Sequence, residues 1–359
     1  MLNFEKLAFL LVDYCLEVKP KQIVLVNADI VALPLVEEIY KKLLMVGAFP
    51  KIEFSSSTFT ELFYTYANDE QLRYVSPISI FQGKNIDSTI TILSQVNTKT
   101  LANIDMDKHR VRSNALFELN QEITKKRWVL TLFPTEGYAQ EAEMSLREFS
   151  KFVSDALFLN SHNPVDSWVK LSEYQKKIID KIGNADQVHI KSDNIDLTFS
   201  IKGRLWLNSD GKQNMPSGEI YTTPIEDSIN GYFRSSFPSN RYGKEIDGVF
   251  LEFKNGELIT AKASKNENYL NKLLDTDDGA KIIGEVGIGL NYGIVKPVNN
   301  ILFDEKIGGT IHIALGQAFE KAGGKNKSNI HLDLISDLRH SGEIIFDGKL
   351  LYKNGSFLI

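Results

Sequence analysis

The stretch QIVLVNADIVALPLVEEIYKKLLMVGAFPKIEF, residues 22 to 54, decides the fold class. It opens with a β-branched apolar run, Gln22–Ala28, which is typical of a buried strand. The segment Ala32–Ala48 follows with apolar residues at helical spacing, and Gly47 is a suitable helix stop. Pro50–Phe54 then predicts a second strand. Together these segments predict a right-handed βαβ unit within a mostly parallel sheet.

The rest of the first half continues the alternation of strands and helices. Ser88–Gln95 and Arg127–Pro134 are predicted to be further buried strands. Ser145–Leu159 predicts a helix capped by Ser145, and Leu171–Ile182 a helix with Ser172 as its cap.

The character of the sequence changes near Gly183, where short alternating strands begin to dominate. Asn255-Gly256 predicts a hairpin, and two further turns of this kind divide the last 17 residues into a three-stranded meander. We therefore predict an N-terminal three-layer α/β domain with a mostly parallel sheet, residues 1–183, and a β-rich α+β C-terminal domain, residues 184–359.

Composition restricts the classes of partner. The chain has 359 residues and a net charge of −5, which gives no electrostatic reason to expect nucleic acid or an anionic membrane. The single cysteine, Cys15, excludes an internal disulfide and a cysteine-rich zinc site, and its apolar neighbours predict a buried thiol. The N-terminal segment is interrupted by Glu5 and Asp13, so we expect an amphipathic helix rather than a signal peptide, and a cytoplasmic protein.

The first half offers little chemistry. It has no phosphate-binding loop, no dinucleotide-binding glycine motif after the first strand and no nucleophile elbow. His109, His162 and His189 are expected to be structural or solvated.

Four stretches of the second half each place an acid or an imidazole in a constrained setting. Glu219 follows Gly218 in NMPSGEIYTTPIEDS, and Glu285 lies among three glycines in KIIGEVGIGLN, where backbone can approach closely. His312 lies in ILFDEKIGGTIHIALG, with its neighbouring isoleucines on the opposite strand face.

The fourth stretch, SNIHLDL, has the two-residue period of a strand. His331 and Asp333 should share one face, while Ile330, Leu332 and Leu334 bury the other. This spacing alone favours a solvated polar face, and a metal half-site or a proton-transfer pair are the alternatives.

Two imidazoles and three carboxylates suit two borderline divalent ions such as zinc, cobalt or manganese. A shared carboxylate can hold such ions roughly 3.5–4 Å apart and leave a bridging water ionised near neutral pH. The candidate metal ligands are Glu219, Glu285, His312, His331 and Asp333.

At these stretches the sequence resembles the metallo-aminopeptidases typified by aminopeptidases T and S. NMPSGEIYTTPIEDS and GEVGIGLN resemble the family's two glutamate motifs, DEKIGGTIHIALG its histidine motif, and KNKSNIHLDLI its His-x-Asp motif. Weaker similarity covers almost the whole chain, and the family's metal ligands fall on the same five residues.

The resemblance implies an enzyme that removes N-terminal amino acids from peptides, with two metal ions, zinc or cobalt, in the C-terminal domain and a homodimeric assembly. Glu285 or Glu219 would move a proton from the attacking water to the leaving amine. A second metal or an acidic residue would receive the free α-amino group of the substrate.

The sequence departs from the family at Phe319, where the family has a tyrosine seven residues after the histidine. If that hydroxyl stabilises the tetrahedral intermediate, its loss removes roughly 2.7–4 kcal/mol of transition-state stabilisation. Lys306 is one candidate for a replacement donor. Leu332, where the family often has tryptophan, should affect packing more than chemistry.

Two alternatives to an active aminopeptidase stay open at this point. One is a catalytically impaired homologue that binds peptides or metal, because of Phe319. The other is a dinuclear phosphoesterase, because the same pair of ions serves in-line displacement. The lack of an arginine or a glycine-rich phosphate cradle near the motifs argues against a phosphoesterase.

Overall fold

The computed structural model describes residues 2–241 and 243–359, which form two compact units. The first comprises residues up to Asp166 together with Gly211–Pro216, and the second comprises Ser167–Asp210 and Ser217–Ile359. The change in sequence character predicted a boundary after residue 183 instead. Ile178 and Ile182, near the end of helix α9 (Pro164–Ile182), belong to the hydrophobic core of the second unit, so most of this helix belongs there.

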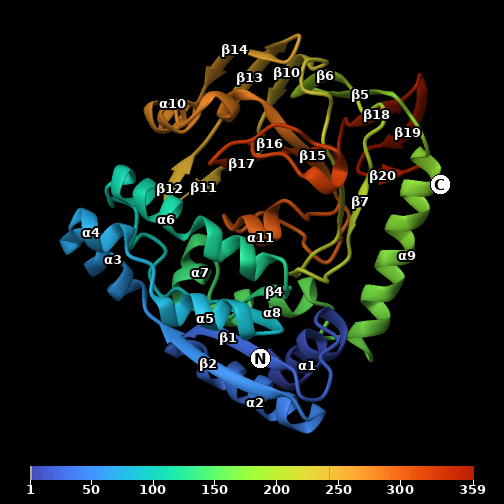
Figure 1. Ribbon diagram of the computed structural model, residues 1–359. Coiled ribbons are helices and arrows are strands. Elements are labelled where there is room, and N and C mark those ends of the chain that lie inside the picture. The colour runs from blue at the N-terminus through green and yellow to red at the C-terminus, as the bar shows by residue number, and fades with distance from the viewer. Residues whose placement is uncertain (1, 242) are drawn as a thin grey trace. The chain divides into compact units, whose positions relative to one another are not determined.

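The first unit is built on a parallel five-stranded sheet with the order β2-β1-β3-β4-β8. Its strands are β1 (Ile23–Asp29), β2 (Phe49–Ser55), β3 (Ser88–Leu93), β4 (Arg127–Leu132) and β8 (Asn214–Met215). Its helices are α1 (Phe4–Phe9), α2 (Leu33–Val46), α3 (Ser57–Tyr66), α4 (Asp69–Arg73), α5 (Pro77–Asn85), α6 (Met106–Thr124), α7 (Glu136–Glu141) and α8 (Leu146–Ala156). The predicted βαβ unit is present as β1-α2-β2 (Figure 1).

Local sequence signals explain several boundaries in this unit. Gly47 ends α2 with a φ of 80°, a left-handed conformation that glycine adopts without steric strain. Ser145 caps α8 in a capping box with Glu148, as predicted. Cys15 is buried, also as predicted.

The prediction for α9 was wrong at its start. The helix begins at Pro164 rather than near Leu171, and the side chain of Asn163 accepts a hydrogen bond from Val165 N at 3.1 Å. Proline suits the first helical position, because the N–H group that it lacks would have no partner within the helix. Ser172 therefore lies inside the helix, where its hydroxyl donates to Asp210.

The second unit contains an eight-stranded sheet, a five-stranded sheet and a two-stranded ribbon. The eight-stranded sheet runs β14 (Glu257–Lys262), β13 (Phe250–Lys254), β10 (Asn230–Arg234), β6 (Ile195–Ser200), β5 (Gln187–Ser192), β18 (Glu343–Phe346), β19 (Lys349–Lys353) and β20 (Ser356–Phe357). The five-stranded sheet runs β17 (His331–Asp337), β16 (Thr310–Gly316), β15 (Ile283–Gly289), β9 (Glu219–Thr222) and β7 (Leu207–Ser209). The ribbon joins β11 (Ser239–Arg241) to β12 (Lys244–Ile246), and the helices are α10 (Glu267–Leu274) and α11 (Ile301–Asp304).

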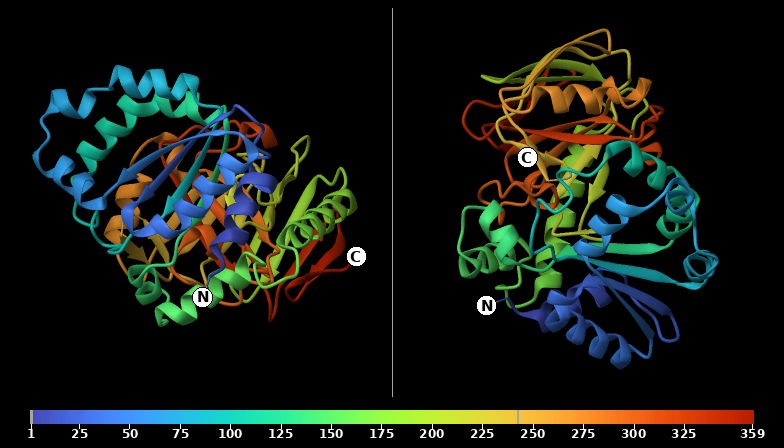
Figure 2. Two further views of the ribbon diagram at one scale, coloured as in Figure 1. Left: turned by 90° about the horizontal axis from the view of Figure 1, so that it is seen from below. Right: turned by 90° about the vertical axis from the view of Figure 1, so that its left-hand side faces the viewer.

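Aliphatic side chains from both large sheets and from α10 share one hydrophobic core. The strands β15, β16 and β17 lie next to one another (Figure 1). Figure 2 shows the second unit from two further sides. The predicted Asn255-Gly256 hairpin joins β13 to β14, and the C-terminal meander is β18-β19-β20. The structure thus has a parallel α/β part and a β-rich part, as predicted.

None of the helices within residues 2–241 and 243–359 combines the length and the apolar character that crossing a membrane requires.

Candidate metal centre

All five predicted ligands lie on the five-stranded sheet of the second unit. Glu219 is the first residue of β9, Glu285 lies on β15, His312 on β16, and His331 and Asp333 on β17. Their strands are neighbours in the order β17-β16-β15-β9. The first three are labelled in Figure 1. Four segments that are distant in sequence therefore meet in one sheet.

The strand register places the five side chains on the same face, because directly paired residues of antiparallel strands point to the same side. On β16, Ala314 pairs with Glu285 on one side and with Asp333 on the other. The further pairs are Gly287 with His312, Gly289 with Glu219, and Gly316 with His331.

Gly287 makes room for the imidazole of His312. A Cβ atom at Gly287 would lie 2.2 Å from Cε1 and 2.3 Å from Nε2 of His312, which is closer than any real contact. The ring of His312 therefore lies across the backbone of β15 at the one position where its neighbour has no side chain. The glycines around Glu285 were predicted to allow close approach of backbone. At Gly287 the group that approaches is the imidazole of His312.

The five side chains form one buried network, which we call the ligand cluster. Nε2 of His312 lies 3.6 Å from Oε2 of Glu219 and 3.6 Å from Oε1 of Glu285. Nε2 of His331 lies 3.0 Å from Oε2 of Glu285 and 3.3 Å from Oδ1 of Asp333. Glu285 thus contacts both imidazoles, one through each carboxylate oxygen.

The tautomer of His331 suits a metal ligand. Its Nδ1 lies 3.0 Å from the carbonyl oxygen of Gln317, which can only accept a hydrogen bond. Nδ1 therefore carries a proton, and Nε2 is the ring nitrogen that faces Glu285 and Asp333 and becomes available to a metal ion when its own proton is lost. Histidine ligands are commonly oriented by such a hydrogen bond from the other ring nitrogen.

Several ligand atoms are buried without a hydrogen-bond partner among the described residues. They are both ring nitrogens of His312, Oε2 of Glu219 and Oδ1 of Asp333. An unpartnered buried polar group costs about 1–3 kcal/mol. One ligand atom each from Glu285, His312 and Asp333 lies within 4.8 Å of the others. Since imidazole and carboxylate are the ligands that zinc and similar ions prefer, these residues fit a divalent metal ion.

The charges of the cluster are strongly coupled. Burial raises the pKa of Glu219. Burial also acts to raise the pKa of Glu285, but the neighbouring imidazoles of His312 and His331 outweigh it and hold that pKa below its usual value. Although burial acts to lower the pKa of both histidines, the neighbouring carboxylates raise it, most strongly for His331. The charge of His331 lowers the pKa of Asp333 against the effect of burial.

Lys306 is fully buried beside the cluster. Its Nζ lies 3.4 Å from Oε1 of Glu219 and also contacts the carboxylate of Glu305. The ammonium group thus offsets part of the negative charge of the carboxylates. Lys306 thus contacts Glu219 and Glu305. The ring of Phe319 instead contacts Tyr221 and His331.

Tyr221 is a site residue that the sequence reasoning missed. It lies two residues after Glu219 on β9 and pairs with Gly287, so it belongs to the same face. Its ring meets the ring of Phe319 edge-on at 5.0 Å, and Phe319 meets His331 edge-on at 5.4 Å. The two-residue alternation in Glu219-Ile-Tyr221 was the available signal.

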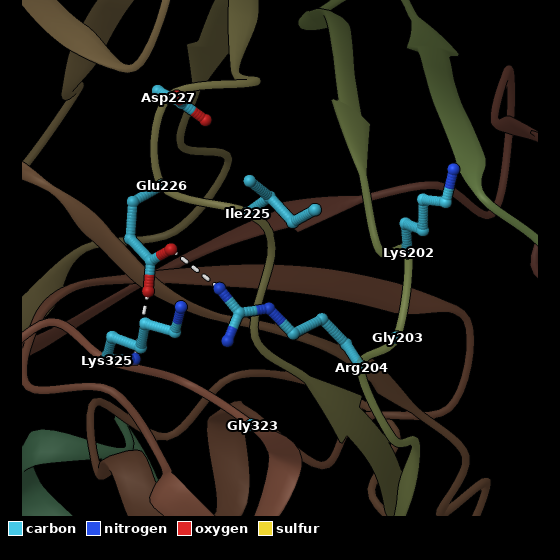
Figure 3. A pocket seen from close by; sticks show the side chains of 8 residues that line it. All are labelled: Lys202, Gly203, Arg204, Ile225, Glu226, Asp227, Gly323 and Lys325. Atoms are coloured by element: carbon cyan, nitrogen blue, oxygen red, sulfur yellow. Dashed lines mark hydrogen bonds and ion pairs between the residues drawn. The ribbon is translucent and has the colours of Figure 1, made fainter.

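The loop that carries Phe319 is fixed at its far end by a salt bridge. Glu226 accepts hydrogen bonds from Arg204 Nη2 at 2.6 Å and from the backbone of Lys325 at 2.9 Å. These residues belong to a hollow of about 520 Å³, which Figure 3 shows and which is lined by Lys202, Gly203, Arg204, Ile225, Glu226, Asp227, Gly323 and Lys325. No residue of the ligand cluster lines this hollow.

The other candidate histidines lie outside the ligand cluster. His189 pairs with Asp196 at 2.6 Å on the eight-stranded sheet. His109 lies on α6 with its ring 5.8 Å from that of Tyr64, and His162 is exposed.

A buried face of two imidazoles and three carboxylates, with unpartnered ligand atoms, is the donor set of a metal-dependent hydrolase. Comparison with known proteins agrees with this class. The model of the thermophilic metalloprotease family (M29) matches residues 2–357, and the chain belongs to this family. The resemblance inferred from the sequence motifs is thereby confirmed.

Individual relatives carry the same kind of name. Aminopeptidase 2 of Geobacillus stearothermophilus is 26% identical, over 99% of this chain and 97% of its own length. Aminopeptidase T of Thermus thermophilus is 27% identical, over 69% of this chain and 66% of its own. The solved structure of wild-type AmpT from Thermus thermophilus superposes with a TM-score of 0.86 at 22% identity and covers 99% of both chains, which establishes the fold.

Proposed function

We propose that this chain is a metallo-aminopeptidase, which removes N-terminal residues from peptides at the ligand cluster. The observation that carries the proposal is the set of buried, unpartnered ligand atoms on Glu219, His312 and Asp333. Membership of a metalloprotease family and the names of the relatives support a peptide substrate.

We further propose that Glu219, Glu285, His312, His331 and Asp333 would together hold two divalent ions, zinc, cobalt or manganese. The contacts divide into two overlapping groups, Glu219 and His312 with Glu285, and His331 and Asp333 with Glu285. When bound, such ions polarise the scissile carbonyl and make water a nucleophile near neutral pH.

The side chains of the protein then position the substrate and move the proton. Glu285 or Glu219 is the candidate to pass the proton to the leaving amine. Oε2 of Glu285 lies 3.0 Å from Nε2 of His331, whereas Oε2 of Glu219 has no hydrogen-bond donor, which favours Glu219. A carboxylate of the cluster is also suited to receive the free α-amino group of a peptide.

The test starts from protein stripped of metal by a chelator and reloaded with zinc, cobalt or manganese separately. Reloaded protein should hydrolyse unblocked aminoacyl anilides and short peptides, but not their N-acetylated counterparts, and should contain two ions per chain. Full activity after prolonged dialysis against excess chelator would contradict the proposal. A parallel panel of phosphoesters tests the phosphoesterase alternative, for which the comparisons give no support.

Two further expectations accompany this function. The family resemblance led us to expect a homodimer, and light scattering after gel filtration measures the molar mass of the assembly. A cytoplasmic location is proposed from the composition, and fractionation of expressing cells tests it.

A further inference from the structure

Phe319 lies beside the ligand cluster, and its ring carries no hydroxyl group. Its ring lies edge-on to both His331 and Tyr221, and 37% of the residue is exposed. Phe319 can pack against a substrate but cannot donate a hydrogen bond to it. A tetrahedral intermediate at the cluster carries a negatively charged oxygen, which needs donors in a fixed place.

Tyr221 brings a hydroxyl group to this location. Through Gly287, which pairs with both Tyr221 and His312, the tyrosine lies two strands away from His312 on the same face. Its ring is in contact with Phe319, and its phenol is close enough to Glu285 and Glu219 to feel their charges. Tyr221 is thus directed toward the ligand cluster and not into the aliphatic core.

The hydroxyl of Tyr221 makes no hydrogen bond to another of the residues that the structure describes. Most buried or half-buried tyrosine hydroxyls have such a partner. A phenol with an ordinary pKa of about 10 keeps its proton at neutral pH and is a good donor. The donor of Tyr221 is therefore available to a substrate bound at the ligand cluster.

We propose that Tyr221 is a catalytic residue, which donates its phenolic hydrogen bond to the oxyanion of the tetrahedral intermediate. The proposal rests on the aminopeptidase function proposed above and assigns one more residue to that reaction. The phenol keeps its proton throughout, so no transfer from Tyr221 is involved. Phe319 holds the tyrosine ring in place by the edge-on contact at 5.0 Å.

The first experiment is Tyr221→Phe, which removes the hydroxyl and keeps the ring. We expect kcat for an unblocked aminoacyl anilide to fall about 100- to 1,000-fold, the typical effect of one lost oxyanion donor. Metal content, KM and thermal stability should change little. An unchanged kcat in this variant, with active wild type, would overturn the proposal.

The matched control returns the hydroxyl across the ring contact. The double variant Tyr221→Phe with Phe319→Tyr moves the hydroxyl from position 221 to position 319. The total number of atoms in the two rings and the hydroxyl stays the same. We expect at least a tenfold recovery of kcat relative to Tyr221→Phe alone. A merely structural role of Tyr221 predicts that Phe319→Tyr raises kcat by the same factor in wild type and in Tyr221→Phe, and that result would count against a donor function.

A binding measurement separates failure of this proposal from failure of the proposed function. The probe is a phosphinic dipeptide analogue with a free amino group, titrated calorimetrically into zinc-loaded protein. Tyr221→Phe should weaken its binding about 10- to 100-fold while leaving binding of the product amino acid unchanged. Equal affinities for the analogue overturn the role of Tyr221. Wild type that is metal-loaded yet neither hydrolyses peptides nor binds the analogue overturns the proposed function and the role of Tyr221 with it.

Discussion

The two faces of the five-stranded sheet differ in almost every property. One face carries the ligand cluster, Tyr221 and the bare position Gly287. The opposite face is mostly aliphatic and contributes these residues to the shared core: Ile220, Val286, Ile288, Ile311, Ile313, Leu315, Leu332 and Leu334. These two sets alternate along the same four strands.

This difference teaches how a buried polar site is kept in place. The aliphatic face buries side chains against the second sheet, which stabilises the strands independently of the ligands. The polar face leaves ligand atoms without partners, which is unfavourable for folding but leaves them available to metal and substrate. A substitution on the polar face should therefore impair function more than stability. A substitution on the aliphatic face should impair stability more than function.

The largest effect is expected for His331→Ala on the polar face. Metal content should fall to one ion or none, and activity should fall about 1,000-fold or more, because bound ions supply several kcal/mol of transition-state stabilisation. The fold should persist, as measured by circular dichroism. His189→Ala is the matched control, since His189 pairs with Asp196 outside the cluster and should keep both metal and activity. Normal metal content in His331→Ala would remove His331 from the site.

Leu334→Ala tests the opposite face of the same strand. Leu334 is 1% exposed and pairs with Ile313, so its truncation leaves a cavity in the core. We expect the free energy of unfolding to fall by about 2–5 kcal/mol, measured by urea denaturation. At a temperature well below the unfolding transition, kcat/KM with saturating metal should stay within about twofold of wild type. A large loss of activity in folded protein would show that the two faces are not independent.

A smaller effect is expected for Gly287→Ala, which adds one methyl group to the polar face. The new Cβ would overlap the imidazole of His312, so the ring must move away from Glu285 and Glu219. Metal affinity should fall about 10- to 100-fold, as for the loss of a group that orients a ligand. Competition with a chromophoric chelator measures this affinity. Unchanged affinity would mean that His312 is free to rotate without loss of binding.

Much of the fold could be predicted because its signals are local. The β1-α2-β2 unit, the cap at Ser145 and the Asn255-Gly256 hairpin each depend on residues close together in sequence. The helices between residues 57 and 124 were not predicted. Neither α3 nor α6 contains a fully buried residue. In α3, however, Phe59, Leu62, Phe63 and Tyr66 have helical spacing, so this signal was available in the sequence and was missed.

The site shows the same limit. Alternation within SNIHLDL correctly placed His331 and Asp333 on one face and the aliphatics on the other. It says nothing about which strands are neighbours, because strand order depends on contacts between distant segments. The pairing of Gly287 with both His312 and Tyr221 is such a contact, and so the roles of Gly287 and Tyr221 emerged only from the structure. The boundary after residue 183 stays a prediction about domain organisation.

The smallest effect concerns the pH dependence of stability in metal-free protein, and it separates the two faces without any assay of activity. The pKa of His331 is raised well above 6.5, so the folded protein holds a proton there that the unfolded chain releases. Such a group stabilises the fold fully below pH 6.5, and this contribution is lost as the pH rises through the raised pKa. The lowered pKa values of Glu285 and Asp333 act in the opposite direction, and their contribution is lost only as the pH falls below about 4.

Metal-free wild type should therefore lose stability as the pH rises above 6.5, by about 1.4 kcal/mol for each unit by which the pKa of His331 is raised. Urea denaturation at pH 6 and pH 8, in the presence of a chelator, measures this slope. His331→Ala should reduce it, because the group with the most strongly raised histidine pKa is gone, while the raised pKa of His312 leaves a smaller slope. Leu334→Ala should shift the whole profile downward without changing its slope, since no group on the aliphatic face titrates. Equal slopes in all three proteins would mean that the polar face contributes nothing to the pH dependence, and the contrast between the two faces would then be limited to metal binding.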